Sequence, residues 1–250
     1  MKPFDYSHFE SQFMDRSYIQ MLQRPRVRFF KDCRRVLDLA CGPGFFLALL
    51  KEAGIEAVGV DRNEAIVEKV RLQGLNVVHS DIFHYLESVE ERRDGIFCSH
   101  LVEHLPFDRV TRLVELIAMR LEPGGVLVLV FPNPGSIRLH LFGFWRDPEH
   151  IRFYNGNLIA SVCQHYGLKV EYSNEEETPN QLKTPRLEPL PFPPDRGWRG
   201  IFRGKRGEMV LFLQELNRRV EAFNQEMERF SEALNKIWSR DDEVVLVLKK

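Results

Sequence analysis

Residues 36–47 read VLDLACGPGFFL, and this stretch decides the fold. Its apolar start predicts a buried strand, its small residues predict a tight turn, and residues 45–53 predict a helix that ends at Gly54. Gly42 and Gly44 allow the backbone to turn sharply and to approach a ligand closely, because glycine has no Cβ atom. A strand, a small-residue turn and a helix in this order indicate an α/β domain that binds a ligand at the turn.

The alternation of strands and helices continues to residue 175. We expect helices at 45–53, 64–73 and 109–121, and strands at 35–39, 57–61, 76–79, 95–99 and 126–131. The sequence Pro123-Gly124-Gly125 predicts a turn between the last of these helices and the last of these strands. Strands that alternate with helices at this spacing predict a parallel sheet covered on both faces.

The pattern changes after residue 175. Six prolines between residues 179 and 194 predict an extended loop, because proline cannot continue a helix or a central strand. A heptad pattern then predicts a long helix over 207–238, and an apolar run at 243–248 predicts a strand that returns to the sheet. We therefore expect one domain made of residues 1–175 and 242–250, with residues 176–241 inserted into it and residues 1–34 forming a helical lid.

Three acidic residues follow or end three successive expected strands. Asp38 would pair with a cationic amino-acid moiety, and Asp61 can accept hydrogen bonds from both hydroxyls of a ribose. Asp81 can accept a hydrogen bond from an exocyclic amine, while Ile82 packs on the face of a purine. A dinucleotide would need a small residue at position 47, where this chain has leucine, and Asp38 would repel a pyrophosphate. Ligands of open α/β sheets bind at the carboxyl ends of the strands, so these groups should meet at one site.

The combination resembles the class I S-adenosylmethionine-dependent methyltransferases. Residues 38–44 (DLACGPG) match the cofactor loop of that family, Asp61 matches its ribose-binding acid, and residues 80–82 (SDI) match its adenine-contacting pair. Residues 94–99 and 121–125 match its fourth and fifth strand regions. The resemblance implies a Rossmann-like seven-stranded sheet of order 3-2-1-4-5-7-6, with an antiparallel seventh strand formed here by residues 244–248.

The resemblance also implies S-adenosylmethionine as the cofactor and a set of residues that hold it. The expected cofactor-binding residues are Asp38, Ala40, Gly42, Gly44, Asp61, Arg62, Asp81, Ile82 and Ser99. Residues 102–105 (VEHL), 131–134 (FPNP) and 146–152 (RDPEHIR) are similar to methyltransferases linked to cell-surface polysaccharide biosynthesis. The resemblance therefore implies methyl transfer to a hydroxyl of a sugar or glycan. A small molecule or lipid as acceptor, and a non-catalytic assembly module, are the alternatives.

Three histidines are candidate catalytic bases, since an alcohol acceptor must lose a proton and histidine titrates near neutral pH. His100 follows the fourth expected strand, His104 lies four residues on, and His150 lies in a polar loop after the fifth strand. Each could equally be a hydrogen-bonded structural residue. We expect no metal site, because Glu103 is the only acidic residue beside His100 and His104.

Composition narrows the partners and the compartment. A net charge of −1 gives no support for nucleic-acid binding, and four isolated cysteines exclude a zinc-knuckle pattern and predict a cytoplasmic protein. No apolar run is long enough to span a membrane, and no signal peptide is visible. The heptad stripe over 209–238 predicts a homodimeric coiled coil; packing of the stripe on the chain's own catalytic domain is the alternative.

Overall fold

The computed structural model describes residues 16–176, 187–189, 206–238 and 241–250. A seven-stranded sheet has the order β3-β2-β1-β4-β5-β7-β6, as expected, and β7 runs antiparallel to both of its neighbours. The strands are β1 (Arg35–Leu39), β2 (Glu56–Asp61), β3 (Val77–His79), β4 (Arg93–Ser99), β5 (Leu121–Pro132), β6 (Lys169–Ser173) and β7 (Glu243–Lys249).

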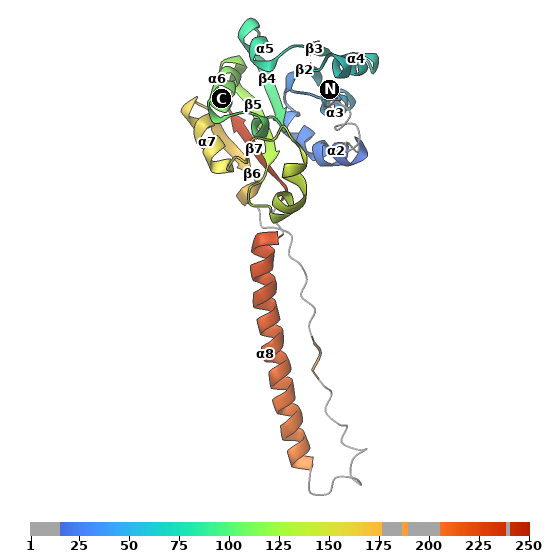
Figure 1. Ribbon diagram of the computed structural model, residues 1–250, viewed down its shortest axis with the longest axis vertical. Coiled ribbons are helices and arrows are strands. Elements are labelled where there is room, and N and C mark those ends of the chain that lie inside the picture. The colour runs from blue at the N-terminus through green and yellow to red at the C-terminus, as the bar shows by residue number, and fades with distance from the viewer. Residues whose placement is uncertain (1–15, 177–186, 190–205, 239–240) are drawn as a thin grey trace, which may run out of the picture. The chain divides into compact units, whose positions relative to one another are not determined.

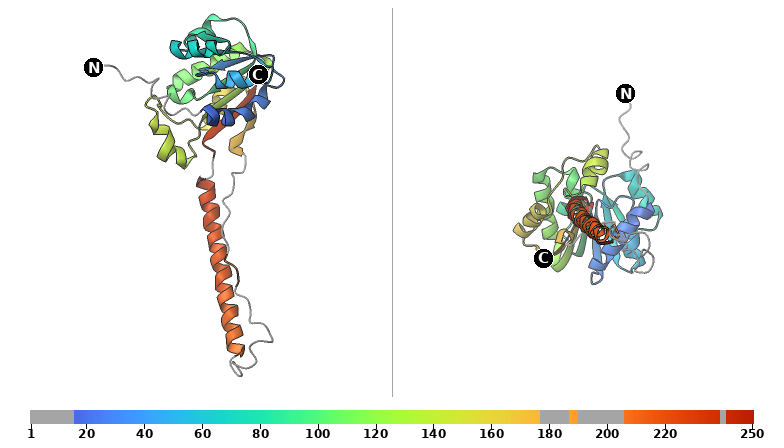
Figure 2. Two further views of the ribbon diagram at one scale, coloured as in Figure 1. Left: turned by 90° about the vertical axis from the view of Figure 1, so that its right-hand side faces the viewer. Right: turned by 90° about the horizontal axis from the view of Figure 1, so that it is seen from below.

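Helices lie on both sides of this sheet (Figures 1 and 2). They are α2 (Arg16–Gln23), α3 (Phe45–Glu52), α4 (Glu64–Leu72), α5 (Ile82–Ser88), α6 (Phe107–Arg120) and α7 (Gly156–His165). Short helical turns connect the larger elements: η1 (Arg24–Phe30), η2 (Val102–His104), η3 (Leu139–Gly143), η4 (Phe144–Arg146) and η5 (Asn174–Glu176).

Continuous apolar strands form because both faces of the sheet are covered. In β5, Leu127 and Leu129 point to the core under α5, α6 and α7, whereas Val128 and Val130 point to the core under α3 and η1. All four are at most 1% exposed. Burial of each such side chain contributes about 1.5–3 kcal/mol, which fixes the register of the central strands.

The fifth strand begins earlier than its sequence indicates. β5 starts at Leu121 instead of residue 126, and Pro123-Gly124-Gly125 forms an irregularity inside it, where the pairing steps from Arg93↔Leu121 to Gly95↔Val126. Two backbone hydrogen bonds hold this irregularity, from Gly124 N to Lys250 O at 2.9 Å and from Lys250 N to Gly125 O at 3.1 Å. Lys250 thus forms backbone hydrogen bonds with the segment that was predicted to be a turn between helix and strand.

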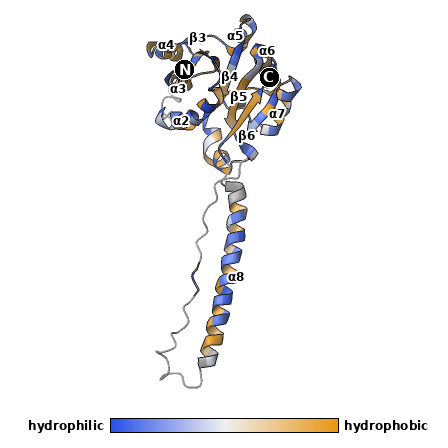
Figure 3. Ribbon diagram, turned by 180° about the vertical axis from the view of Figure 1, so that it is seen from behind, coloured by the Kyte–Doolittle hydropathy of each residue, from blue (hydrophilic) through white to orange (hydrophobic). Residues whose placement is uncertain are grey.

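The chain divides into two compact units. The described parts of the first are residues 16–134, 139–176 and 242–250, and those of the second are residues 135–138, 187–189, 206–238 and 241. The second unit contains α8 (Arg206–Trp238), along which apolar and polar residues interleave (Figure 3). Most of the expected proline-rich loop lies outside the described residues.

A buried amide joins two described segments of the second unit. Asn224 of α8 is 2% exposed, and its side chain makes two hydrogen bonds of 2.9 Å with the backbone N–H and carbonyl of Leu187. Phe223 and Phe230, two members of the heptad stripe, are 52% and 60% exposed. None of the described helices has the length and apolarity needed to cross a membrane.

Candidate functional site

A cavity of about 820 Å³ opens at the carboxyl ends of the central strands. Its position follows from the topology, because parallel pairing sets Leu39 of β1 beside Val60 of β2 and Cys98 of β4. The residues that follow these positions must then converge on one edge of the sheet. The cavity is lined by nearly all of the expected cofactor residues: Asp38, Ala40, Gly42, Asp61, Arg62, Asp81, Ile82 and Ser99.

The turn after β1 is built in left-handed backbone conformations. Ala40 and Gly42 have φ values of 55° and 49°, in the left-handed region that favours glycine, so Ala40 holds a strained conformation. The Asp61 carboxylate holds the turn, since its Oδ2 accepts from Gly42 N at 2.9 Å and its Oδ1 accepts from Asn63 N at 2.8 Å. Asp61 therefore both lines the cavity and fixes the backbone that forms its floor.

Gly44 is placed differently from the other expected cofactor residues. It does not line the cavity; it is the N-cap of α3, with φ 74°. A Cβ atom on Gly44 would lie 2.9 Å from Cγ1 of Val70 in α4. The structure thus explains this glycine by its conformation and by the close packing of two helices.

Asp38 is the buried acid of the site. It is 2% exposed, and its Oδ2 has no hydrogen-bond partner among the described residues. Burial, together with the neighbouring Asp61 carboxylate, raises the pKa of Asp38 well above its usual range. A buried carboxyl without a partner suits a ligand that brings a positive charge.

Residues at the start of α5 and directly after β2 also line this part of the cavity. Oδ1 of Asp81 caps α5 by accepting from Phe83 N at 2.9 Å and His84 N at 3.1 Å. Arg62 forms an exposed ion pair with Glu149, with 2.8 Å between Nη2 and Oε2. Asp81 is therefore a helix cap and a cavity residue at once.

His100 is held between two carboxylates. Its Nδ1 lies 3.0 Å from Glu103 Oε1, and its Nε2 lies 2.6 Å from Glu243 Oε1. Burial alone would lower the pKa of His100, but the hydrogen bonds to Glu103 and Glu243 outweigh it and hold this pKa above its usual range. An imidazolium that donates from both nitrogens has no lone pair with which to take a proton.

Sequence reasoning missed Glu243 and its partner Arg26. Arg26 is 7% exposed and forms an ion pair with Glu243, and contact with His100 and Arg26 lowers the pKa of Glu243 to about 2 against the effect of burial. The antiparallel direction of β7 was the available signal. Because β7 runs antiparallel to β5, it begins where β5 ends. Its first residue, Glu243, therefore pairs with Pro132, at the carboxyl ends of the parallel strands.

His104 and His150 lie together on another wall of the cavity. Their rings meet edge to face with 4.7 Å between the centroids. Nδ1 of His150 lies 2.7 Å from the carbonyl oxygen of Phe144, so Nδ1 carries the proton and Nε2 keeps a lone pair. Burial lowers the pKa of His104 below its usual range. The structure thus brings all three candidate histidines to the cavity and gives them different environments.

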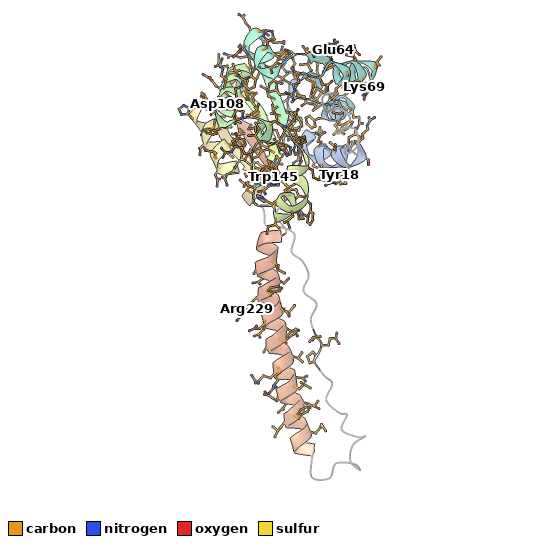
Figure 4. The ribbon with its side chains drawn as sticks, in the orientation of Figure 1. Tyr18, Glu64, Lys69, Asp108, Trp145 and Arg229 are labelled. Carbon is orange, nitrogen blue, oxygen red and sulfur yellow. The ribbon has the colours of Figure 1, made fainter. Side chains whose placement is uncertain are left out.

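Part of the expected lid also reaches the cavity. Ile19 and Gln23 of α2 line it. Oε1 of Gln23 is buried and unpaired within the described part of the chain. Figure 4 labels Tyr18 of α2 and Trp145 of η4, which mark two of the segments beside the cavity. The first 15 residues of the expected lid lie outside the described residues.

Comparison with known proteins places this geometry in context. The family model described as a methyltransferase domain matches residues 6–173. The ubiquinone biosynthesis O-methyltransferase of Alkalilimnicola ehrlichii is 27% identical over 118 residues, covering 44% of this chain and 47% of that protein. The trans-aconitate 2-methyltransferase of Rhodopseudomonas palustris is 32% identical over 127 residues, 48% of each chain. This chain thus spans about half the length of these two relatives.

A solved structure matches nearly the whole chain. The crystal structure of a SAM-dependent methyltransferase from Archaeoglobus fulgidus aligns with a TM-score of 0.71 and 29% identity, over 99% of this chain and 100% of that chain. The similarity therefore extends beyond the residues that the family model matches.

Proposed function

Because the chain belongs to the family of methyltransferase domains, we propose that it transfers a methyl group from S-adenosylmethionine to a hydroxyl oxygen of a sugar or glycan. The observation that carries this proposal is the cavity at the strand ends. One part of it is lined by Asp38, Asp61 and Asp81, and another by His104 and His150. The first part fits the cofactor, and the second leaves a polar wall for an acceptor.

The acidic part of the cavity fits the cofactor group by group. The unpartnered buried carboxyl of Asp38 suits the ammonium of the methionine moiety, and Asp61 suits the ribose hydroxyls. Asp81 and Ile82 offer an acceptor for the exocyclic amine and an apolar contact for the purine. When bound, the cofactor supplies an activated methyl group on a sulfonium, and the chain's residues position the attacking oxygen.

The other part of the cavity supports an oxygen acceptor. His104 and the Nε2 side of His150 offer lone pairs to a hydroxyl, and His100, held between Glu103 and Glu243, lines the same cavity. We place loss of the acceptor proton at the wall formed by His104 and His150. The name of the ubiquinone biosynthesis relatives, O-methyltransferases, supports transfer to oxygen. A small-molecule or lipid hydroxyl is the second candidate acceptor, on the same ground.

A non-catalytic assembly module built around α8 is the rival reading. It gives no reason for an unpartnered carboxyl at Asp38, since a buried carboxyl oxygen without a partner costs stability when nothing binds there. The site therefore favours an enzyme.

The test is a methyl-transfer assay with radiolabelled S-adenosylmethionine and a panel of nucleotide-sugars, glycolipids and lysate fractions. We expect label in a carbohydrate-containing product. S-adenosylhomocysteine should raise the melting temperature of the protein, because a ligand that binds only the native state stabilises it. NAD is the matched control and should not raise it; a clear shift with NAD would favour a dehydrogenase and contradict the proposal.

A further inference from the structure

We propose that Glu103, His104 and His150 form a binding site for a divalent transition-metal cation at the acceptor side of the cavity. One carboxylate oxygen of Glu103 and one ring nitrogen of each histidine lie within 4.8 Å of one another. Two imidazoles and a carboxylate suit Zn²⁺, Mn²⁺ or Fe²⁺ better than Mg²⁺ or Ca²⁺, which favour oxygen ligands alone. This site replaces the sequence-based expectation of no metal.

The state of the Glu103 carboxylate is the second, independent observation. Glu103 is 1% exposed, and its Oε2 is buried with no hydrogen-bond partner in the part of the chain that the structure describes. Its other oxygen, Oε1, accepts from His100 Nδ1 at 3.0 Å. Leaving a buried carboxylate oxygen unpaired costs free energy unless a cation or donor binds there. The hydrogen bond from His100 orients the carboxylate, as partners of metal ligands commonly do.

The imidazoles of His104 and His150 each have a ring nitrogen that can bind a cation. The Phe144 carbonyl fixes the proton of His150 on Nδ1, which leaves Nε2 to act as a ligand. No hydrogen bond joins either ring nitrogen of His104 to another described residue, so a lone pair is available there too. Asp147 Oδ2 lies 3.7 Å from His150 Nε2, and Asp147 also lines the cavity.

The backbone joins the two segments that carry these ligands. Glu103 and His104 belong to η2, whereas His150 follows η4, which contains the Trp145 labelled in Figure 4. The carbonyl oxygen of Glu103 accepts from Ile151 N at 2.8 Å. This hydrogen bond fixes the distance between the two segments, so the three ligands are positioned before any cation binds.

The cation would have a direct role in methyl transfer. Three protein ligands leave coordination positions open toward the cavity, where an acceptor hydroxyl can bind. With the imidazole lone pairs bound to the cation, coordination instead of an imidazole assists deprotonation at this wall: it lowers the pKa of that hydroxyl, and the proton leaves to solvent water. The oxygen lone pair then forms the bond to the methyl carbon as the carbon–sulfur bond breaks, and the electrons of that bond stay on sulfur. This role rests on the proposed function, whereas binding of the cation does not.

Calorimetric titration of the full chain tests the site. The protein is freed of any affinity tag, stripped with a chelator, and titrated with the chlorides of Zn²⁺, Mn²⁺ and Mg²⁺. We expect one equivalent of Zn²⁺ or Mn²⁺ to bind, with Mg²⁺ at least about tenfold weaker. His104→Ala and His150→Ala should each weaken binding by at least about tenfold. His165→Ala, which removes an exposed histidine at the end of α7, is the matched control and should bind as the wild type does.

Two results would overturn the site: absence of saturable Zn²⁺ and Mn²⁺ binding to the wild type, or unchanged affinity in both histidine variants. Circular dichroism checks the fold of each variant, and a glutamine replaces the alanine where the alanine variant does not fold. Cation binding without methyl transfer would contradict the proposed function alone. Methyl transfer by a protein that binds no cation would contradict the metal site alone.

Discussion

At the scale of single residues, Asp38 has opposite effects on the stability of the empty protein and on ligand binding. Its carboxyl is buried, lies near the Asp61 carboxylate, and has an oxygen without a partner in the described chain. An ionised group in such a place destabilises the empty protein. The same group gives a cationic ligand a partner that water does not screen.

Asp38→Asn should therefore stabilise the ligand-free protein at pH 7. Because the pKa of Asp38 is higher in the folded than in the unfolded chain, ionisation favours unfolding, and the wild type loses free energy of unfolding as the pH rises from about 4 through the folded-state pKa. The variant lacks this loss. Its affinity for S-adenosylhomocysteine should fall by roughly 10-fold to 150-fold, since a hydrogen bond to a charged group contributes about 1.5–3 kcal/mol.

Melting temperatures measured between pH 4 and pH 8, with and without ligand, check both effects. Asp32→Asn is the matched control, because Asp32 is exposed and remote from the cavity lining. If Asp38→Asn melts at the wild-type temperature across this pH range, ionisation of Asp38 does not destabilise the folded protein.

The histidine wall gives the second prediction at this scale. His104→Ala or His150→Ala should lower turnover by about 10² to 10⁴, the usual range for loss of a group that assists proton removal. The affinity for S-adenosylhomocysteine should barely change, because the expected cofactor contacts lie on other residues. Initial rates and binding titrations are to be compared with those of His165→Ala. Wild-type turnover in both variants would point to an acceptor that is an amine, a thiol or an already acidic group.

At the scale of secondary structure, the absence of a side chain at Gly44 lets the start of α3 pack closely against α4. A methyl group at this position meets two penalties. A φ of 74° costs a residue with a Cβ atom about 1–2 kcal/mol, and the approach to Val70 at 2.9 Å forces the packing to shift. Gly54 has nearly the same φ, 73°, but nothing lies within 4 Å of its added Cβ atom. Comparing Gly44→Ala with Gly54→Ala therefore separates the free-energy cost of backbone strain from the cost of close packing.

We expect Gly44→Ala to lower the free energy of unfolding by about 1–3 kcal/mol more than Gly54→Ala does, since overpacking a close contact typically costs that much. Urea unfolding of the two variants measures the difference. Equal losses would mean that α4 moves aside without cost, and that conformation alone explains the glycine at position 44.

At the scale of the whole molecule, the heptad stripe of α8 exposes apolar side chains. Phe223, Phe230 and Leu234 are 52%, 60% and 42% exposed. We expect the wild type to be a dimer at tens of micromolar, because an apolar stripe sustained over four heptads favours pairing of two helices. The double variant Val220→Asp, Met227→Asp should be monomeric, since two charges in the seam cannot be desolvated.

Sedimentation velocity distinguishes the outcomes. A wild type that stays monomeric would favour packing of the stripe within its own chain, and a dimer that survives both substitutions would place the interface elsewhere. The whole-chain match to the Archaeoglobus fulgidus structure makes that protein the natural comparison for the same measurement.

The sequence by itself determined most of the elements. The apolar runs and the strand–turn–helix at residues 36–47 predicted every strand except β6, and the resemblance to the class I methyltransferases implied the sheet order that the structure has. These features are local: apolar periodicity and glycine conformation act within a few residues, so a single stretch of sequence reveals them.

Only the tertiary structure decided what each polar side chain contacts. It clamped His100 between Glu103 and Glu243, which are 3 and 143 residues away, and it set His150 beside His104. It also paired Lys250 with the irregularity at Gly124 and Gly125. The physical reason is that protonation and hydrogen bonding depend on burial and on neighbours within a few ångströms, and those neighbours come from distant parts of the chain that meet only when the sheet has formed.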